Sequence, residues 1–248
     1  MGQSLRKNHG FGHWLWYGRG TRTPWVRRVL AVVFFFLVPA PVILLLLFRF
    51  LPVPFSPQMA LDLVTFQPVH YTWRSYDDIS HALPRAVIGA EDQNFCTHHG
   101  FDWKNIDKAM ADHERHPNKP LRGASTISQQ TARTIFLVPA RSWVRKGLEA
   151  YLTVLIEALW PKKRILTAYL NLVDWGHGNY GAEAAAEAYF GTTADKLTRS
   201  QAARLAAILP NPDHWRADHP GRYVAGRSKH LRGQEFVVAD SGLDWCVK

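Results

Sequence analysis

Apolar residues recur through most of the chain at the three- and four-residue spacing of an amphipathic helix. From Asp77 onward this period is almost continuous, and no long stretch alternates apolar with polar residues. Such a pattern predicts a mainly α-helical domain. The pattern changes at 29–48, which reads VLAVVFFFLVPAPVILLLLF and carries no charge. Twenty consecutive apolar residues can cross a lipid bilayer as a helix, so we predict one N-terminal transmembrane anchor there.

Capping residues and prolines set the expected helix boundaries. Pro84 suits the first turn of a helix that ends at Glu91, and Asp102 suits the N-cap of the following helix. Helices after Glu91 are expected, in chain order, at 103–113, 127–137, 142–160, 162–173, 182–190 and 201–209. We expect Ser200 to cap the last of them.

Two segments lack the helical period. The segment 51–76 is rich in proline and aromatic residues, so we predict a linker with short extended pieces, such as 69–73. The segment 113–122 contains two prolines and is predicted to be a loop. This loop could close over a bound substrate or serve as a solvated connector, and the sequence leaves both open.

These changes in pattern divide the chain into parts. The 248 residues are enough for one ordinary domain and an appendage. The predicted parts are a basic tail at 1–28, the anchor at 29–48, a linker at 49–76, the main helical domain at 77–232 and a C-terminal tail at 233–248.

Positive charge is concentrated in front of the apolar run. The formal net charge is +10, and the first 28 residues contain no acid. Their six basic residues are Arg6, Lys7, Arg19, Arg22, Arg27 and Arg28. This placement favours a membrane over nucleic acid as the partner, and it predicts a cytoplasmic N-terminus with the rest of the chain outside. A cleavable signal peptide has a shorter apolar region followed by small residues, so we expect an uncleaved anchor.

The chain has two cysteines, Cys96 and Cys246. With the predicted topology they lie in an oxidising compartment, where they could form a disulfide. Such a bond would tie the C-terminal tail to the region around Glu91. Spacing alone cannot establish the geometry that a disulfide requires, so the pairing stays open.

Candidate chemistry is concentrated at 91–102, which reads EDQNFCTHHGFD. Glu91 is expected at the end of a half-buried helix, and partial loss of water strengthens a carboxylate as a proton acceptor. Alternatively, Glu91 and Asp92 only cap helix ends. His98 and His99 could ligate a metal, but they lack a companion at helical spacing, so we favour structural hydrogen bonds for them.

Two further motifs follow, at 123–133 (GASTISQQTAR) and at 145–149 (RKGLE). Together with 91–102 they resemble the peptidoglycan glycosyltransferases of glycosyltransferase family 51. The resemblance continues through ILTAYLN at 165–171, through the glycines of 176–181 and through LPNP at 209–212. It covers roughly 79–231.

The resemblance implies a fold and an activity. The implied fold is a lysozyme-like helical lobe beside a smaller membrane-proximal lobe, with a substrate groove between them. The implied reaction polymerises lipid II with inversion and adds it to a growing glycan chain, and undecaprenyl diphosphate leaves. The implied location is the bacterial inner membrane with a periplasmic catalytic domain. Other cell-wall synthesis or division proteins are candidate partners, and nucleic acid is not.

The resemblance also implies roles for particular residues. Glu91 would take the proton from the 4-hydroxyl of the acceptor sugar, and Glu149 would assist departure of the diphosphate directly or through a cation or water. The side chains implied to hold the diphosphate are Arg133, Arg141, Arg145 and Lys146. The neutral groups implied to bind substrate are Ser125, Thr126, Gln129 and Gln130. We predict no protein metal site and no definite cofactor, although a divalent cation such as Mg²⁺ or Mn²⁺ is compatible with this chemistry.

Three positions depart from the usual pattern of the family. Arg133 stands where the family usually has Lys, Thr134 where it has Asn, and Thr167 where it has Glu. The two threonines lose an amide and a carboxylate, so we expect weaker or altered substrate contacts. They also make a catalytically idle membrane scaffold conceivable.

A lysozyme-like hydrolase or lytic enzyme is the nearest alternative, because it would share a helical lobe and a catalytic glutamate. It would not need several cations after the STISQQ run. We expect no transpeptidase activity, because the sequence contains no Lys-Thr-Gly and its Ser-x-x-Lys, at 4–7, lies in the predicted cytoplasmic tail.

Overall fold

The computed structural model describes residues 24–118, 123–139 and 142–248 and confirms the mainly helical fold. The helices of the N-terminal part are α2 (Pro24–Leu37), α3 (Pro39–Phe48), α4 (Pro57–Val64) and α5 (Ala82–Glu91). Those that follow are α6 (Trp103–Arg115), α7 (Ile127–Phe136), α8 (Trp143–Leu159), α9 (Lys162–Leu172), α10 (Gly181–Phe190), α11 (Arg199–Ile208) and α12 (Arg222–Asp240). Two short strands, β1 (His70–Tyr71) and β2 (Asn179–Tyr180), pair in parallel.

The described chain forms two compact units that divide after Leu47. In the first unit, α2 and α3 follow each other with a break at Val38, just before Pro39. The stretch Trp25–Phe48 contains an 18-residue window with a mean hydropathy of 3.0, and it is long and apolar enough to cross a membrane. This finding agrees with the predicted anchor at 29–48. Most of the basic residues from which we predicted its orientation lie outside the described residues.

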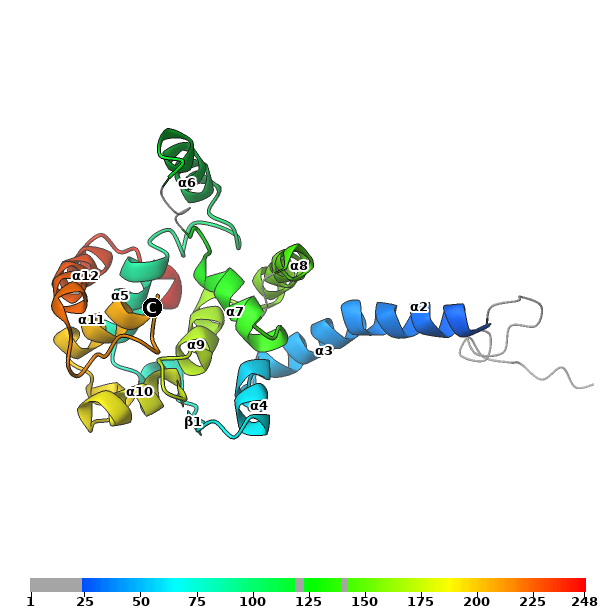
Figure 1. Cartoon of the computed structure of the whole chain (residues 1–248), viewed down its shortest axis with the longest axis horizontal. Helices are drawn as coiled ribbons and strands as arrows, with labels where there is room; N and C mark the ends of the chain where they lie inside the picture. The colour runs from blue at the N-terminus through cyan, green and yellow to red at the C-terminus, as the bar shows by residue number, and fades with distance from the viewer. Residues whose placement is uncertain (1–23, 119–122, 140–141) are drawn as a thin grey trace, which may run out of the picture. The chain divides into compact units, whose positions relative to one another are not determined.

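The second unit contains two groups of helices. Helices α5, α11 and α12 pack against one another, and α7 packs against both α8 and α9 (Figure 1). Helix α9 is buried along its last eight residues, and α10 and α11 are rich in buried alanine. Small side chains allow helices to approach closely at the packing density of protein interiors. These helices form the core on which the site-bearing segments rest.

Glycine is required where β2 meets α10. Gly181 has a φ of +83°, and a Cβ added there would lie 2.4 Å from the carbonyl oxygen of Asn171. The buried Asn171 side chain in turn bonds both backbone groups of Arg74, at 2.7 and 2.9 Å. Arg74 also contacts the buried Glu183 at 2.5 Å. The segment that precedes α5 is thereby held against α9 and α10.

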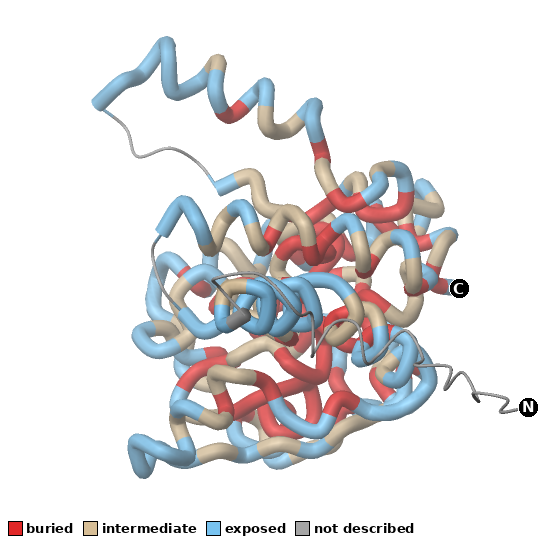
Figure 2. Tube along the Cα trace, turned by 90° about the vertical axis from the view of Figure 1, so that its right-hand side faces the viewer, coloured by how far each residue is buried: buried red, intermediate tan, exposed pale blue. Residues whose placement is uncertain are grey.

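Helix α6 differs from the core helices because most of its residues are exposed. Figure 2 shows buried residues concentrated inside the second unit, whereas the uppermost helix is mainly exposed. The helix begins where the Asp102 side chain accepts a hydrogen bond from the Asn105 backbone at 3.0 Å. This N-cap was predicted, and it is confirmed.

Three details of the expected secondary structure were wrong. The predicted linker contains α4, whose start signal, Ser56 followed by Pro57, we overlooked. Helix α11 is capped by Thr198 in a capping box with Gln201, not by Ser200. We also did not predict α12, which continues across residue 232, the predicted end of the main domain. Its four buried side chains leave an apolar period too sparse to recognise in the sequence.

Cys96 and Cys246 form a disulfide across 150 residues, so the alternative that the sequence left open is realised. Nearby, Asp244 accepts a hydrogen bond from Arg85 of α5 at 2.8 Å, and Val247 is buried. The segment after α12 is therefore fastened both to α5 and to the loop that follows Glu91.

Replacing both Cys96 and Cys246 by serine should lower the free energy of unfolding by about 2–5 kcal/mol, because a cross-link over a long loop restricts the unfolded chain. Urea unfolding of the full chain in detergent, followed by circular dichroism, measures this difference. A reducing agent should destabilise the wild-type protein by a similar amount and leave the double variant unchanged. Equal effects of the reducing agent on both proteins would contradict the prediction.

Candidate active site

Glu91 is the last residue of α5, and its side chain is 18% exposed. Its Oε2 accepts a hydrogen bond from Gln130 Nε2 at 3.1 Å. On the other side, Arg227 Nη2 lies 3.9 Å from its Oε1. The carboxylate is thus held between α7 and α12 while part of it stays accessible. This is the partly buried acid that the sequence predicted.

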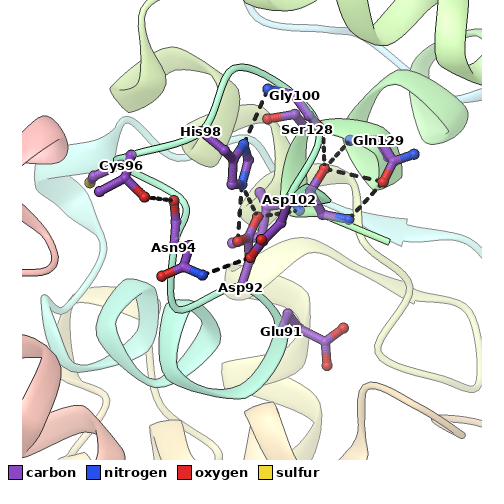
Figure 3. A network of polar contacts seen from close by, with 12 residues as sticks. Glu91, Asp92, Asn94, Cys96, His98, Gly100, Asp102, Ser128 and Gln129 are labelled. Carbon is purple, nitrogen blue, oxygen red and sulfur yellow. Dashed lines mark hydrogen bonds and ion pairs between the residues drawn. The ribbon is translucent and has the colours of Figure 1, made fainter. Parts of the chain in front are cut away.

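The neighbouring Asp92 is buried and faces a different set of groups. Its carboxylate accepts a hydrogen bond from the backbone N–H of Ile127 at 3.0 Å and contacts His98 Nε2 at 2.9 Å. Ile127 is the first residue of α7, where backbone N–H groups favour a negative charge. Figure 3 shows Asp92 within this network and the Glu91 side chain directed away from it. Of the two adjacent acids, one joins helices and the other remains accessible.

His98 and Asp102 complete the network around Asp92. His98 Nδ1 accepts a hydrogen bond from the Gly100 backbone at 3.1 Å, so both of its ring nitrogens make structural contacts, as we favoured. Burial acts to raise the pKa of Asp102. Hydrogen bonds from Asn94 and Asn105 outweigh burial and hold this pKa below its usual value. Asp102 therefore remains a charged N-cap.

Glu149 lies on α8 and is almost fully buried. Its carboxylate forms an ion pair with Lys146 and lies 3.3 Å from Arg145 Nη1. These residues are three and four positions apart, so one helix face brings them together. Lys146 Nζ also lies 3.4 Å from Ser125 Oγ, which accepts a hydrogen bond from it. The RKGLE motif is therefore one cluster of charges connected to the STISQQ motif.

Two neighbouring cavities contain most of the predicted site residues. The first has a volume of about 670 Å³ and is lined by Glu91, Ser125 and Thr126 among others. The second, of about 570 Å³, is lined by Gln130, Arg133, Thr134, Arg145 and Tyr169 among others. Because Glu91 of the first cavity bonds directly to Gln130 of the second, the candidate base and the candidate cations belong to one site.

Two of the predicted substrate-binding residues have structural contacts. Thr126 caps α7, and Gln129 accepts a hydrogen bond from the Thr126 backbone at 3.0 Å in a capping box. Thr126 Oγ1 also donates to the Gly100 carbonyl at 2.7 Å, and both side chains are buried. Arg141, a predicted diphosphate ligand, lies outside the described residues.

Tyr169 and Arg227 belong to the site, but sequence reasoning missed them. The Tyr169 hydroxyl donates to Gln130 Oε1 at 3.4 Å. Burial, reinforced by the nearby charge of Glu91, raises the pKa of Tyr169 well above its usual value, so it remains a neutral donor. This contact orients the Gln130 amide so that its nitrogen faces Glu91. Tyr169 lies in the recognised ILTAYLN motif, whereas Arg227 had no signal because α12 was not predicted.

The two unusual threonines have their hydroxyls bonded to their own helices. Thr134 donates to the Gln130 carbonyl at 2.9 Å, and Thr167 donates to the Lys163 carbonyl at 2.6 Å. Thr134 lines the second cavity, where the usual asparagine would present an amide. This short side chain leaves fewer polar groups facing that cavity.

The described residues include no group of three or more His, Cys, Asp or Glu side chains that could hold a metal ion. Both oxygens of Glu149 contact cationic side chains. Whether a divalent cation takes part in the reaction stays a prediction to be tested with a chelator.

A family model described as Transglycosylase matches residues 60–234. A biosynthetic peptidoglycan transglycosylase of Caulobacter vibrioides is 50% identical over 222 residues, covering 90% of this chain and 96% of the relative. A protein of the same name from Chromohalobacter salexigens is 48% identical, covering 85% of this chain and 93% of the relative. Another, from Escherichia coli, is 52% identical, covering 77% of this chain and 82% of the relative.

One carboxylate of the second cavity generates a prediction of pH dependence. Burial raises the pKa of Asp174 from 3.8 to about 6, and Asp213 and Asp62 add to this effect. Asp174 loses its proton at a lower pH in the unfolded chain than in the folded chain. The free energy of unfolding should therefore fall as the pH rises from about 4 to about 6.

Replacing Asp174 by asparagine should remove this loss. Between pH 4 and a pH above 6, the free energy of unfolding of the wild type should fall by roughly 2–3 kcal/mol more than that of the variant. Thermal or urea unfolding across this pH range provides the measurement. The exposed Asp240 at the end of α12, changed to asparagine, serves as the control. Parallel pH profiles for all three proteins would refute the assignment.

Proposed function

The chain belongs to the transglycosylase family and is a peptidoglycan glycosyltransferase, and we propose that Glu91 is the base of its reaction. One observation supports this assignment most: Glu91 is a partly accessible carboxylate that is joined through Gln130 to a cavity lined by Arg133 and Arg145. A base beside a group of cations suits transfer of a sugar from a diphosphate. A glycan-cleaving enzyme would not need these cations, so this alternative is not favoured.

The proposed step begins in the first cavity. Glu91 takes the proton of the acceptor 4-hydroxyl, and the oxygen attacks the anomeric carbon of the donor sugar. The bond from this carbon to the phosphate oxygen breaks, and undecaprenyl diphosphate leaves with the electron pair. Attack opposite the leaving group inverts the configuration of the anomeric carbon. Gln130, fixed by Tyr169, and Arg227 hold the Glu91 carboxylate in place.

The cations of the second cavity are proposed to receive the diphosphate. Arg133 and Arg145 line this cavity, and guanidinium groups can bond two phosphate oxygens at once. Glu149 is buried and contacts Arg145 and Lys146, so we assign it a positioning role that acts through these cations. Ser125 extends the cluster toward the first cavity through its contact with Lys146.

Membrane attachment suits a substrate carried by a lipid. The apolar helix Trp25–Phe48 is consistent with an inner-membrane anchor, and it would confine the enzyme and lipid II to the same surface. We propose a cytoplasmic N-terminus, a periplasmic catalytic domain at 77–232 and the other segment boundaries predicted above. Association with other cell-wall synthesis or division proteins remains a prediction.

Replacing Glu91 by glutamine should reduce polymerisation of lipid II at least about a hundredfold, because the amide cannot accept the proton. The assay uses the full chain in detergent, with and without a chelator. The unfolding midpoint should be nearly unchanged, since glutamine can still bond Gln130. The exposed Glu187 of α10, changed to glutamine, is the matched control. Retention of more than about a tenth of the activity, or cleavage of purified cell wall without polymer formation, would overturn the assignment.

Arg133→Ala should lower kcat/KM for lipid II about ten- to a hundredfold through the loss of one charge-assisted phosphate contact. Arg133→Lys should retain most of the activity because it keeps the charge. Steady-state kinetics of both variants test this expectation, with the exposed Arg232→Ala of α12 as the control. If Lys and Ala variants were equally impaired, the role of Arg133 would lie in packing rather than in phosphate binding.

A further inference from the structure

A third cavity lies beside the candidate active site, in a part of the structure to which the proposed reaction assigns no role. It has a volume of about 450 Å³ and is formed by the loop between α5 and α6 and by the first turn of α6. Its lining residues are Asn94, Thr97, His98, His99, Phe101, Asp102, Trp103 and Lys104. Asp102 also lines the first cavity, so this third cavity adjoins the one that Glu91 faces.

The third cavity contains an exposed aromatic surface. The rings of Phe101 and Trp103 stack with their centroids 5.5 Å apart and an interplanar angle of 29°. The Trp103 residue is 67% exposed although it stands at the start of a well-capped helix. An indole left in water forgoes the free energy of burying its apolar area, so such a surface points to a ligand.

Polar groups line the same cavity as this aromatic surface. Asn94 provides an amide, Thr97 a hydroxyl, and Lys104 a cation, and all three line the same cavity. A sugar ring has apolar C–H faces that can lie on an aromatic ring and hydroxyls at its edge that form hydrogen bonds. The Lys104 ammonium could pair with a carboxylate of a peptide attached to the sugar. A few polar groups around an aromatic patch are typical of small-ligand sites.

The wall of the third cavity is held in its present shape. Asp102 accepts hydrogen bonds from Asn94 and Asn105, and His98 is fixed between Asp92 and the Gly100 backbone. The disulfide at Cys96 fastens the middle of the same loop. A preformed site loses less conformational entropy when its ligand binds.

We propose that the third cavity binds the growing glycan strand beyond the two sugars that react, with Phe101 and Trp103 as the stacking surface. This inference rests on the proposed function, which makes a polysaccharide in the adjoining first cavity. Because Asp102 lines both cavities, they are neighbours, and a strand that extends from Glu91 would lie near this surface. A lipid bilayer is a less suitable ligand for this cavity, because the polar side chains of Asn94, Thr97 and Lys104 would lose their contact with water.

Binding a strand outside the reacting sugars affects how long it stays on the enzyme. The first coupling of two lipid II molecules does not use the third cavity, whereas every later addition does. Removal of the aromatic surface should therefore shorten the product strands and leave the rate of the first coupling largely unchanged.

The test compares Trp103→Ala and Trp103→Tyr with wild type, using the full chain in detergent. Trp245→Ala is the control, because Trp245 is 63% exposed and lines none of the three cavities. Binding is measured by calorimetry with soluble, lipid-free peptidoglycan glycan fragments, and strand length is measured on the polymer made from lipid II. Trp103→Ala should bind the fragments about five- to tenfold more weakly and make strands less than half as long. Trp103→Tyr should restore much of both.

Two results would overturn the inference. One is that Trp103→Ala matches Trp245→Ala in fragment binding and in strand length. This result is also the one expected if Trp103 only contacts the membrane, because detergent contains no bilayer. The other is that Trp103→Tyr is as impaired as Trp103→Ala, which would show a packing effect. If wild type bound fragments through Trp103 but polymerised no lipid II, the proposed function would fail while glycan binding at this cavity stood.

Discussion

The geometry of the site depends on the contacts of the buried Asp92 carboxylate. It joins the end of α5 to the first backbone N–H of α7 and to His98 of the intervening loop. A buried charge is tolerated only where such donors replace water, and losing one of them would leave the charge poorly compensated. Because α5 ends in Glu91 and α7 carries Gln130 and Arg133, this carboxylate holds the proposed base near the cations.

Beside Asp92, two sets of polar contacts hold the side chains of the site. Tyr169 orients Gln130, Gln130 bonds Glu91, and Arg227 approaches the same carboxylate from α12. A parallel set connects Glu149 to Lys146 and Lys146 to Ser125. The first set holds the proposed base and the second holds a proposed phosphate ligand, and enzymes limit reorganisation during reaction by fixing such groups in advance. The exposed face of the site is left for substrate.

Local patterns predicted the helices well, and longer-range features poorly. The cap at Asp102 and the helix after Thr126 follow from neighbouring residues, so the sequence was sufficient for them. Helix α12 was missed because it is polar along most of its length and is stabilised by packing on α5 and α11. The burial of Glu149 and the approach of Arg227 to Glu91 arise from tertiary packing, which no short motif encodes. Motif resemblance implied that both Gln129 and Gln130 bind substrate, but it could not distinguish Gln129, which caps a helix, from Gln130, which contacts Glu91.

The disulfide also has a consequence for biogenesis. Translation produces Cys96 150 residues before Cys246, an interval of roughly 8–30 seconds at about 5–20 residues per second. Throughout this interval the nascent chain lacks the partner of Cys96, so the thiol in the loop beside Glu91 cannot form its native disulfide. Oxidation to the native pair thus reports that the intervening polypeptide has been made, and prematurely terminated chains would remain chemically distinguishable from finished ones.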